Sequence, residues 1–422
     1  MTLPRIPRRA FLAAAVLAAV RLGAAPDADA LRKRALDGET AAQLELADEF
    51  FFGRNRPANP ALAAYWYRRA ANSGSPEGEY NLGACYEHGW GVRKSPQQAF
   101  ECYSRAAEKG SLPARTRRAL LLISGIPAED WGDARYPERR ADPETALAEL
   151  RRAAENYAPA KLALALHLHN DPKKREEHAS EIGELARAAA ETPGAGAEAM
   201  LFYADCLSRG FGMDPDPKRA AQVLGRAIQA GSASALSRLG RMLEFGLGVP
   251  PNPERALELY REAAQRNDPA GMTRLGDHYL SGNFVSTDPV QALELYRKAA
   301  DAKYPPAFAK LGDCLAGGWG APADAKEAFL AYETGAKLGD APAQYRLARC
   351  FAEGKGTVVD PAAAAFWYKC AASLGSRDAV RELGRMLLHG RGVPADPAEG
   401  KRLLQAAASA GDREAAEELE RL

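Results

Sequence analysis

The sequence predicts an all-α fold, a solenoid of about ten helix-turn-helix repeats of 36 residues each. The chain has 422 residues, 46% of them hydrophobic, and its apolar content is dominated by Ala and Leu. These residues are strong helix formers, whereas strands are rich in Val, Ile and Thr. A Leu-Gly pair also recurs at a spacing of 36 residues, and such a period is typical of stacked helical repeats. The pair is found at Leu239-Gly240, Leu275-Gly276, Leu311-Gly312, Leu347-Ala348 and Leu383-Gly384.

Residues 1–30 have the features of an export signal. Arg5, Arg8 and Arg9 precede an uncharged stretch from Ala10 to Val20, which is the length of a signal-peptide core and too short to span a membrane. The sequence from Arg8 to Leu12 is similar to the twin-arginine signal, with ordinary secretion as the alternative. Cleavage is expected after Ala24 or after Ala30. We therefore expect a periplasmic or secreted protein that is not inserted in the membrane after the signal is removed.

The repeats fill residues 31–413. Counting in steps of 36 from Gly240 reaches Gly384 in one direction and Ala204 in the other, and the same step joins Ala47, Gly83 and Ala119. Two longer steps, from 119 to 165 and from 165 to 204, place irregular insertions near residues 126–143 and 190–197. Residues 414–422 are predicted to form a capping helix, because a solenoid needs a polar cover at its open end.

Each repeat has the signals of two helices. In the repeat that begins near Ala235, apolar residues at a spacing of three and four predict a first helix, and Gly246-Leu247-Gly248 ends it. Asn252-Pro253 then opens the second helix, since Asn can accept a hydrogen bond from a free amide and Pro needs no partner at the first helical position. The glycine of the Leu-Gly pair is expected where the two helices approach most closely. These structural glycines are Gly83, Gly240, Gly276, Gly312 and Gly384.

This pattern resembles the Sel-one-like repeat (SLR) family, a relative of the tetratricopeptide repeat. The residues that carry the resemblance are Gly83-x-x-Tyr86-x-x-Gly89-x-Gly91-Val92, followed by Tyr103-x-x-Ala106-Ala107-x-x-Gly110. The match is equally close from Phe366 to Ala372 and from Leu383 to Val393. In repeats one, three and four the sequence departs from the family pattern. The resemblance implies a right-handed superhelix whose first helices line a concave groove. It also implies an adaptor that binds proteins.

Composition and motifs exclude several other classes. With 56 Lys and Arg against 55 Asp and Glu, the chain has no basic excess with which to bind nucleic acid. The Gly-x-Gly pairs lack the strand and the Lys-Ser/Thr of a phosphate-binding loop, and His167 and His169 point to different sides of a helix. We therefore expect no cofactor, no metal and no catalytic residues. The alternative is a cell-envelope hydrolase or β-lactam-binding protein, and it rests on the repeat fold alone.

The six cysteines follow the repeat pattern. Cys85, Cys206, Cys314 and Cys350 all stand two residues after the anchor, where other repeats have Met242, Met386, Leu121 and His167, so these thiols are predicted to fill the core. Equivalent cysteines of adjacent repeats are expected to lie too far apart for a disulfide. Cys85 and Cys102 fall on the two helices of one repeat, and a disulfide between them remains possible.

The candidate partner-binding residues follow from a rule for tetratricopeptide-like repeats. In such repeats the groove is lined by the residues three before, one after and four to five after the anchor. In the last two repeats this rule selects Tyr345, Arg349, Glu353, Arg381, Arg385 and His389, and in the two before them it places Asp277 and Asp313 one residue after the anchor. The groove is expected to be cationic toward its carboxyl end and acidic near its middle. Arg holds carboxylates bidentately, so a protein or peptide partner with an acidic segment is predicted.

Overall fold

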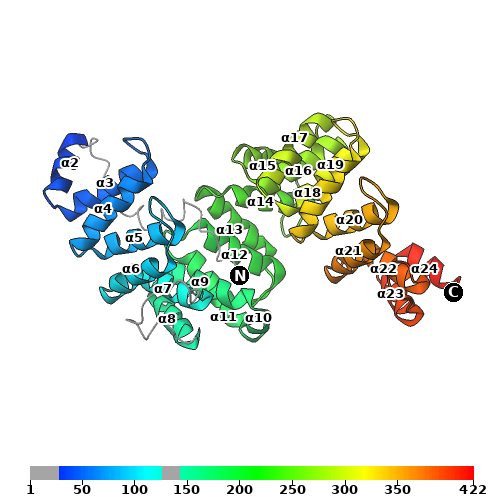
Figure 1. Ribbon diagram of the computed structural model, residues 1–422, viewed down its shortest axis with the longest axis horizontal. Coiled ribbons are helices and arrows are strands. Elements are labelled where there is room, and N and C mark those ends of the chain that lie inside the picture. The colour runs from blue at the N-terminus through cyan, green and yellow to red at the C-terminus, as the bar shows by residue number, and fades with distance from the viewer. Residues whose placement is uncertain (1–27, 126–142) are drawn as a thin grey trace. The chain divides into compact units, whose positions relative to one another are not determined.

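The computed structural model describes residues 28–125 and 143–422, which form helices and no strand (Figure 1). They divide into an amino-terminal body that ends at Ala230 and a carboxyl-terminal body from Gly231 to Leu422. The predicted signal up to residue 27 and the insertion at residues 126–142 lie outside the described residues. The all-helical repeat fold is as predicted.

The amino-terminal body consists of α2 and five helical repeats, shown in blue to green in Figure 1. Helix α2 (Ala28–Leu36) precedes them. Repeat one consists of α3 (Thr40–Phe52) and α4 (Pro60–Asn72), and repeat two of α5 (Pro76–His88) and α6 (Pro96–Glu108). Repeat three consists of α7 (Leu112–Ser124) and α8 (Pro143–Asn156), and repeat four of α9 (Ala158–Asn170), α10 (Pro172–Glu177) and α11 (Ala179–Glu191). Repeat five consists of α12 (Ala197–Arg209) and α13 (Pro217–Gln229).

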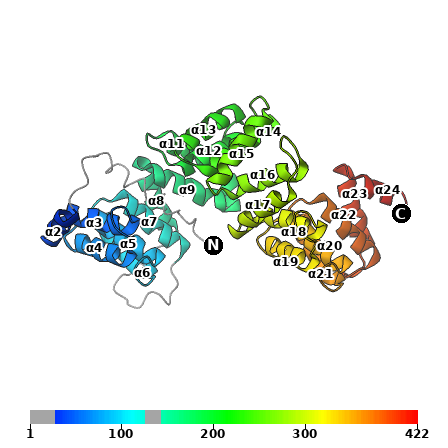
Figure 2. The same cartoon turned by 90° about the horizontal axis from the view of Figure 1, so that it is seen from above.

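The carboxyl-terminal body consists of five regular repeats and a final short helix. Repeat six consists of α14 (Ala233–Phe245) and α15 (Pro253–Gln265), and repeat seven of α16 (Pro269–Ser281) and α17 (Pro289–Asp301). Repeat eight consists of α18 (Pro305–Gly317) and α19 (Ala325–Lys337), and repeat nine of α20 (Ala341–Glu353) and α21 (Pro361–Ser373). Repeat ten consists of α22 (Arg377–His389) and α23 (Pro397–Ser409). Helix α24 (Arg413–Leu419) packs on α23. The first helices of these repeats begin 36 residues apart, and Figure 2 shows the pairs following one another along the body.

The helix ends form as the sequence predicts. Asn252 accepts a hydrogen bond from the backbone amide of Arg255 at 3.0 Å and so caps α15. Asp288 caps α17 in the same way through the amide of Gln291, also at 3.0 Å. Gly246 ends α14 in the left-handed conformation, with φ 66°, which a residue with a Cβ adopts at a cost.

The glycine of the Leu-Gly pair makes room for a tyrosine of the second helix. A Cβ added at Gly240 would lie 2.7 Å from a ring carbon of Tyr260, and one added at Gly276 would lie 2.8 Å from a ring carbon of Tyr296. Gly83 meets Tyr103 in the same way, and Gly312 meets Tyr332 more closely still. Gly384 is different because the carbonyl oxygen of Gly400, at 3.1 Å, is its nearest neighbour. These five glycines therefore set the distance between the two helices of their repeats.

A second glycine closes the contact between consecutive repeats. At Gly91, Gly320 and Gly392, a Cβ would overlap the backbone at the start of the preceding repeat's second helix, and φ is positive at all three. Repeat seven has Phe284 at this place, with φ 62° and with half of its surface exposed. The loop of repeat seven therefore holds an aromatic side chain in a conformation for which repeats two, eight and ten use glycine.

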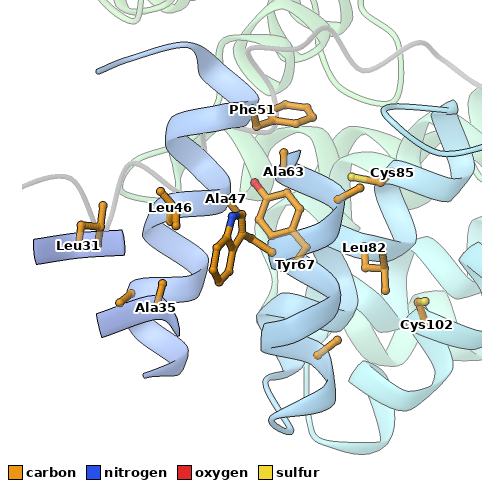
Figure 3. Close-up of a cluster of buried hydrophobic side chains, with 14 residues drawn as sticks. Leu31, Ala35, Leu46, Ala47, Phe51, Ala63, Tyr67, Leu82, Cys85 and Cys102 are labelled. Carbon is orange, nitrogen blue, oxygen red and sulfur yellow. The ribbon is translucent and has the colours of Figure 1, made fainter. Parts of the chain in front are cut away.

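The core is a chain of apolar clusters, each shared by neighbouring helices. Figure 3 shows the first of them, in which Leu31 of α2 and Tyr67 of α4 belong to one buried cluster with Cys85 and Cys102. All six cysteines are free thiols, so Cys85 and Cys102 are not joined in this structure. Burial raises the pKa of both thiols to about 12, which keeps them protonated and unreactive. The cysteines fill the core, as their position in the repeat predicts.

Candidate interaction surface on the first helices

The carboxylates predicted to make the groove acidic accept hydrogen bonds from the buried tyrosines. The Tyr296 hydroxyl donates to Asp277 Oδ1 at 2.8 Å, and the Tyr332 hydroxyl donates to Asp313 Oδ1 at the same distance. Burial, and then the neighbouring aspartate, raises the pKa of each tyrosine well above its usual range. Repeats one, two and six have the same arrangement, with Tyr67 on Asp48, Tyr103 on Glu87 and Tyr260 on Glu244. These carboxylates therefore hold the two helices of a repeat together.

The same carboxylates also contact a cation from the next repeat. Lys310 Nζ lies 2.9 Å from Asp277 Oδ1, and Arg346 Nε lies 2.9 Å from Asp313 Oδ1. Both cations stand two residues before the anchor of their own repeat. About a quarter of each aspartate side chain remains exposed, 27% and 28%. The acidic positions are thus largely neutralised within the fold while staying accessible at the surface.

The arginines predicted to make the carboxyl end cationic have carboxylate partners as well. Arg349 donates to Glu353 Oε1 from Nε at 2.9 Å and from Nη2 at 2.7 Å, and Glu353 also pairs with Lys355 at 2.6 Å. Because the Arg349 pair lies on the surface of one helix, it contributes only about 0.3–0.5 kcal/mol. Arg349 therefore remains available to an external carboxylate at little cost.

Arg381 and Arg385 instead fasten repeat ten to the final helix. The buried Arg381 donates from Nη1 to Asp412 at 2.6 Å, next to the start of α24. Arg385 donates to Glu418 within α24 and to Glu382 at 2.9 Å within α22. Both arginines thus have a structural role at the end of the solenoid. The prediction that they bind a partner stays a prediction.

The other two predicted lining residues differ in exposure. Tyr345 is half-buried, and its ring centre lies 5.8 Å from that of Tyr368 in the second helix of the same repeat. His389 is exposed at the last position of α22. Tyr345, beside Arg349, is the aromatic member of the predicted set.

Repeat six contributes residues that the sequence analysis did not name. Arg241, one residue after the anchor, is exposed and forms no ion pair among the described residues. Phe245 is 55% exposed, and the guanidinium carbon of Arg274 lies 5.8 Å from the centre of its ring. The lining rule would have found Arg241 and Phe245 if it had been applied to repeat six. Arg274 follows from the three-dimensional arrangement alone.

The histidines and acidic residues of the described part of the chain serve other purposes than metal binding. No group of three His, Cys, Asp or Glu residues there is arranged to hold a metal ion. His169 packs edge-on against Phe202 and Phe211, and His178 pairs with Glu181 at 2.9 Å. None of the helices within residues 28–125 and 143–422 is long and apolar enough to cross a membrane.

Curated proteins resemble parts of this chain. An uncharacterized protein of Neisseria meningitidis is 30% identical over 185 residues, which cover 43% of this chain and 35% of that protein. The DAP3-binding cell death enhancer 1 of Rattus norvegicus is 33% identical over 92 residues, covering 22% of this chain and 18% of that protein. The matches thus span about a third or less of these relatives.

A solved structure and a family model match much more of the chain. The crystal structure of c5321, a protective antigen of uropathogenic Escherichia coli with an SLR fold, is 26% identical, with a TM-score of 0.54 over 93% of this chain and 81% of that one. The model of the Sel1 repeat matches eight segments in the register described above, and repeats three and four lie outside them. The segments are residues 40–75, 76–111, 197–232, 233–268, 269–304, 305–340, 341–376 and 377–412. Since these segments make up more than half of the sequence, the chain belongs to the Sel1 repeat family.

Proposed function

We propose that this protein is an exported, non-enzymatic scaffold that binds a peptide or protein segment on the exposed face of its first helices. Sel1 repeats typically form protein-interaction scaffolds, and the rat relative is named for its binding to another protein. Each body offers a row of similar first helices. Such a surface suits an extended partner.

One observation carries the proposal: the ten repeats keep the residues that the fold requires and vary those on the exposed face of the first helices. The anchor is Gly or Ala in every repeat. One residue after it the side chains differ: Arg241 and Arg349 are accessible on the surface, whereas Asp277, Asp313 and Arg385 pair within the fold. Packing explains why the anchor stays small, because a larger side chain there would meet the second helix. Variation at the position after the anchor is expected of a surface that binds a specific partner.

Two parts of this face have the composition of an interface. Repeats six and seven bring Arg241, Phe245 and Arg274 to the surface, and repeat nine brings Tyr345 and Arg349. Aromatic residues and Arg are enriched in protein interfaces and dominate their binding energy. An acidic segment with an apolar side chain fits both parts, since a guanidinium can hold its carboxylate and an aromatic ring can cover its apolar group.

The test reverses charge on the first helices and compares it with the same change elsewhere. Arg241→Glu with Arg349→Glu should lose the partners that the unaltered protein captures from its host, by about tenfold or more if each Arg contacts a carboxylate. Arg255→Glu with Arg402→Glu is the matched control, because these two arginines are 55% and 68% exposed on the second helices of repeats six and ten. Capture that is equal in all three proteins, with circular dichroism unchanged, would reject the first-helix face. A nitrocefin assay on the same samples distinguishes a scaffold from a β-lactam hydrolase.

Export is proposed from the sequence of residues 1–30, and the structure bears on the choice of cleavage site. Leu31 and Ala35 of α2 are fully buried, while cleavage after Ala30 would remove the first three residues of this helix. Cleavage after Ala24 leaves α2 whole, so the mature protein should begin at Ala25. Amino-terminal sequencing of the exported protein checks this expectation. Arg8→Lys with Arg9→Lys should retain the precursor in the cytoplasm if the twin-arginine route is used, and normal export of that variant would exclude the route.

A further inference from the structure

In repeat seven, three apolar residues join the first helix to the second helix. Met272 and Leu275 of α16 are buried, and both belong to clusters that Leu295 of α17 completes. Met272 stands four residues before the anchor, and Leu275 stands directly before it. Leu295 precedes the tyrosine that packs on the anchor glycine. These three positions therefore form part of the core of repeat seven.

Repeat three has charged residues at all three positions. When the anchors Ala119 and Gly276 are matched, Arg115 and Arg118 take the places of the two α16 residues. When the Ala153-Ala154 pair of α8 is matched to the corresponding pair of α17, Glu149 takes the place of the leucine. Replacement of three core positions by ions is costly unless each charge has a partner.

These residues surround a hollow in the amino-terminal body. Arg115 and Arg118 of α7 and Glu149 and Arg152 of α8 line a cavity of about 210 Å³. A hollow of this volume is large enough to admit a polyatomic ion.

The lining carries an excess of positive charge. Arg118 donates to both oxygens of Glu149, from Nη2 at 2.7 Å and from Nε at 3.2 Å, so this pair neutralises itself. Arg115 and Arg152 form no ion pair with any carboxylate among the described residues. Two guanidinium groups that share one hollow repel each other, and a bound anion would remove that repulsion. The excess of two charges matches an anion with two negative charges.

We propose that the hollow of repeat three is a binding site for a divalent oxyanion, such as a phosphate group or a dicarboxylate. Arg presents two parallel N–H groups that match the oxygens of either anion. Arg115 and Arg152 supply these donors from the two helices that the anion would bridge. Glu149 keeps Arg118 turned into the hollow. The site is independent of the proposed partner-binding face, because it rests on other residues of another body.

The test uses inorganic phosphate and malonate as probes on the purified mature protein. Isothermal titration should show one site that prefers these dianions to chloride at equal ionic strength. Arg115→Gln with Arg152→Gln should weaken binding by about tenfold or more, because each removes a charge-assisted contact. Binding of phosphate alone would narrow the ligand to phosphoryl groups, and binding of both probes would support a general dianion site.

A second variant keeps the test decisive if the first proves unstable. Arg115→Met with Arg118→Leu and Glu149→Leu rebuilds the apolar cluster of repeat seven, so it should fold at least as well and lose the site. Unchanged binding by this variant, or no binding by the unaltered protein, would overturn the proposal. Glu129, Asp130 and Asp133 lie outside the described residues. If binding appears only after they are replaced by their amides, the chain's own carboxylates are the occupant, and the proposal is also overturned.

Discussion

A glycine at the anchor lets a tyrosine ring lie against the backbone of the first helix, and the tyrosine hydroxyl then reaches a carboxylate on that helix. In repeat eight these residues are Gly312, Tyr332 and Asp313. The hydrogen bond satisfies the one polar atom of a buried ring, so the ring can fill the core without leaving a polar group unpaired. The anchor glycine and the carboxylate beside it thus hold the tyrosine together, one by leaving room for its ring and the other by accepting its hydrogen bond.

Replacement of Gly312 by Leu should destabilise the protein by about 1–3 kcal/mol, the usual range for overpacking. The cause is the ring of Tyr332, which lies where even a Cβ has no room. Urea unfolding measures the loss. Because neighbouring repeats share their interfaces, faster amide exchange should concentrate in repeats seven to nine.

Gly225 of α13 is the control for this change. It also lies within a helix, but no atom lies within 4 Å of a Cβ added there. Gly225→Ala should therefore be neutral or stabilise by up to about 1 kcal/mol, since Ala is the better helix former. Equal destabilisation by both changes, or amide exchange that rises uniformly along the chain, would contradict the proposed close packing of Tyr332 against Gly312.

At the scale of the helices, the sequence was sufficient to predict the fold. The period of 36 residues, the Asp-Pro and Asn-Pro starts and the glycine ends are local signals, and each appears in the structure at its expected place. The two longer steps between anchors also correspond to the irregular repeats three and four. Local signals suffice here because each helix pair contacts only its neighbours.

The candidate site was less predictable, because the roles of its residues depend on partners distant in sequence. Asp277 lies one residue after its anchor, as does Arg241, yet Asp277 receives Tyr296 from 19 residues away and Lys310 from the next repeat. Arg385 likewise reaches α24, 33 residues on. A rule based on position in the first helix selects the surface but cannot show which charges are already paired. The distinction between binding and structural residues needs the packed helices.

At the scale of the whole molecule, the buried thiols should make stability fall at alkaline pH. Burial raises the pKa of Cys206, Cys314 and Cys350 to about 11, and that of Cys85 and Cys102 to about 12. In the unfolded chain these thiols lose their protons near pH 9, so above that pH the folded state binds more protons than the unfolded state. Stability is then complete below about pH 9 and is lost as the pH rises toward 11 or 12.

The expected loss at pH 10 is about 1.4 kcal/mol for each thiol. Urea midpoints in the presence of a reductant, compared at pH 7.5 and pH 10, measure it. A variant with Cys206, Cys314 and Cys350 replaced by Ala should show a weaker dependence on pH than the unaltered protein. A midpoint that is as high at pH 10 as at pH 7.5 would show that the thiols titrate alike in both states.

The unbroken step of 36 residues from repeat six onward means that this chain can change its length only in fixed amounts. Loss of residues 305–340 would place repeat nine directly after repeat seven, and Arg346 would meet Asp277 in the position that Lys310 holds now. Such a deletion should fold, with a helical circular dichroism spectrum and a cooperative transition. A deletion of 35 or 37 residues with its break inside a helix would turn the two parts of that helix by about 100° relative to each other, so its apolar stripe would be interrupted and the protein should be less stable. Duplication or loss of whole repeats is therefore the route by which a protein of this kind can gain or shed binding surface.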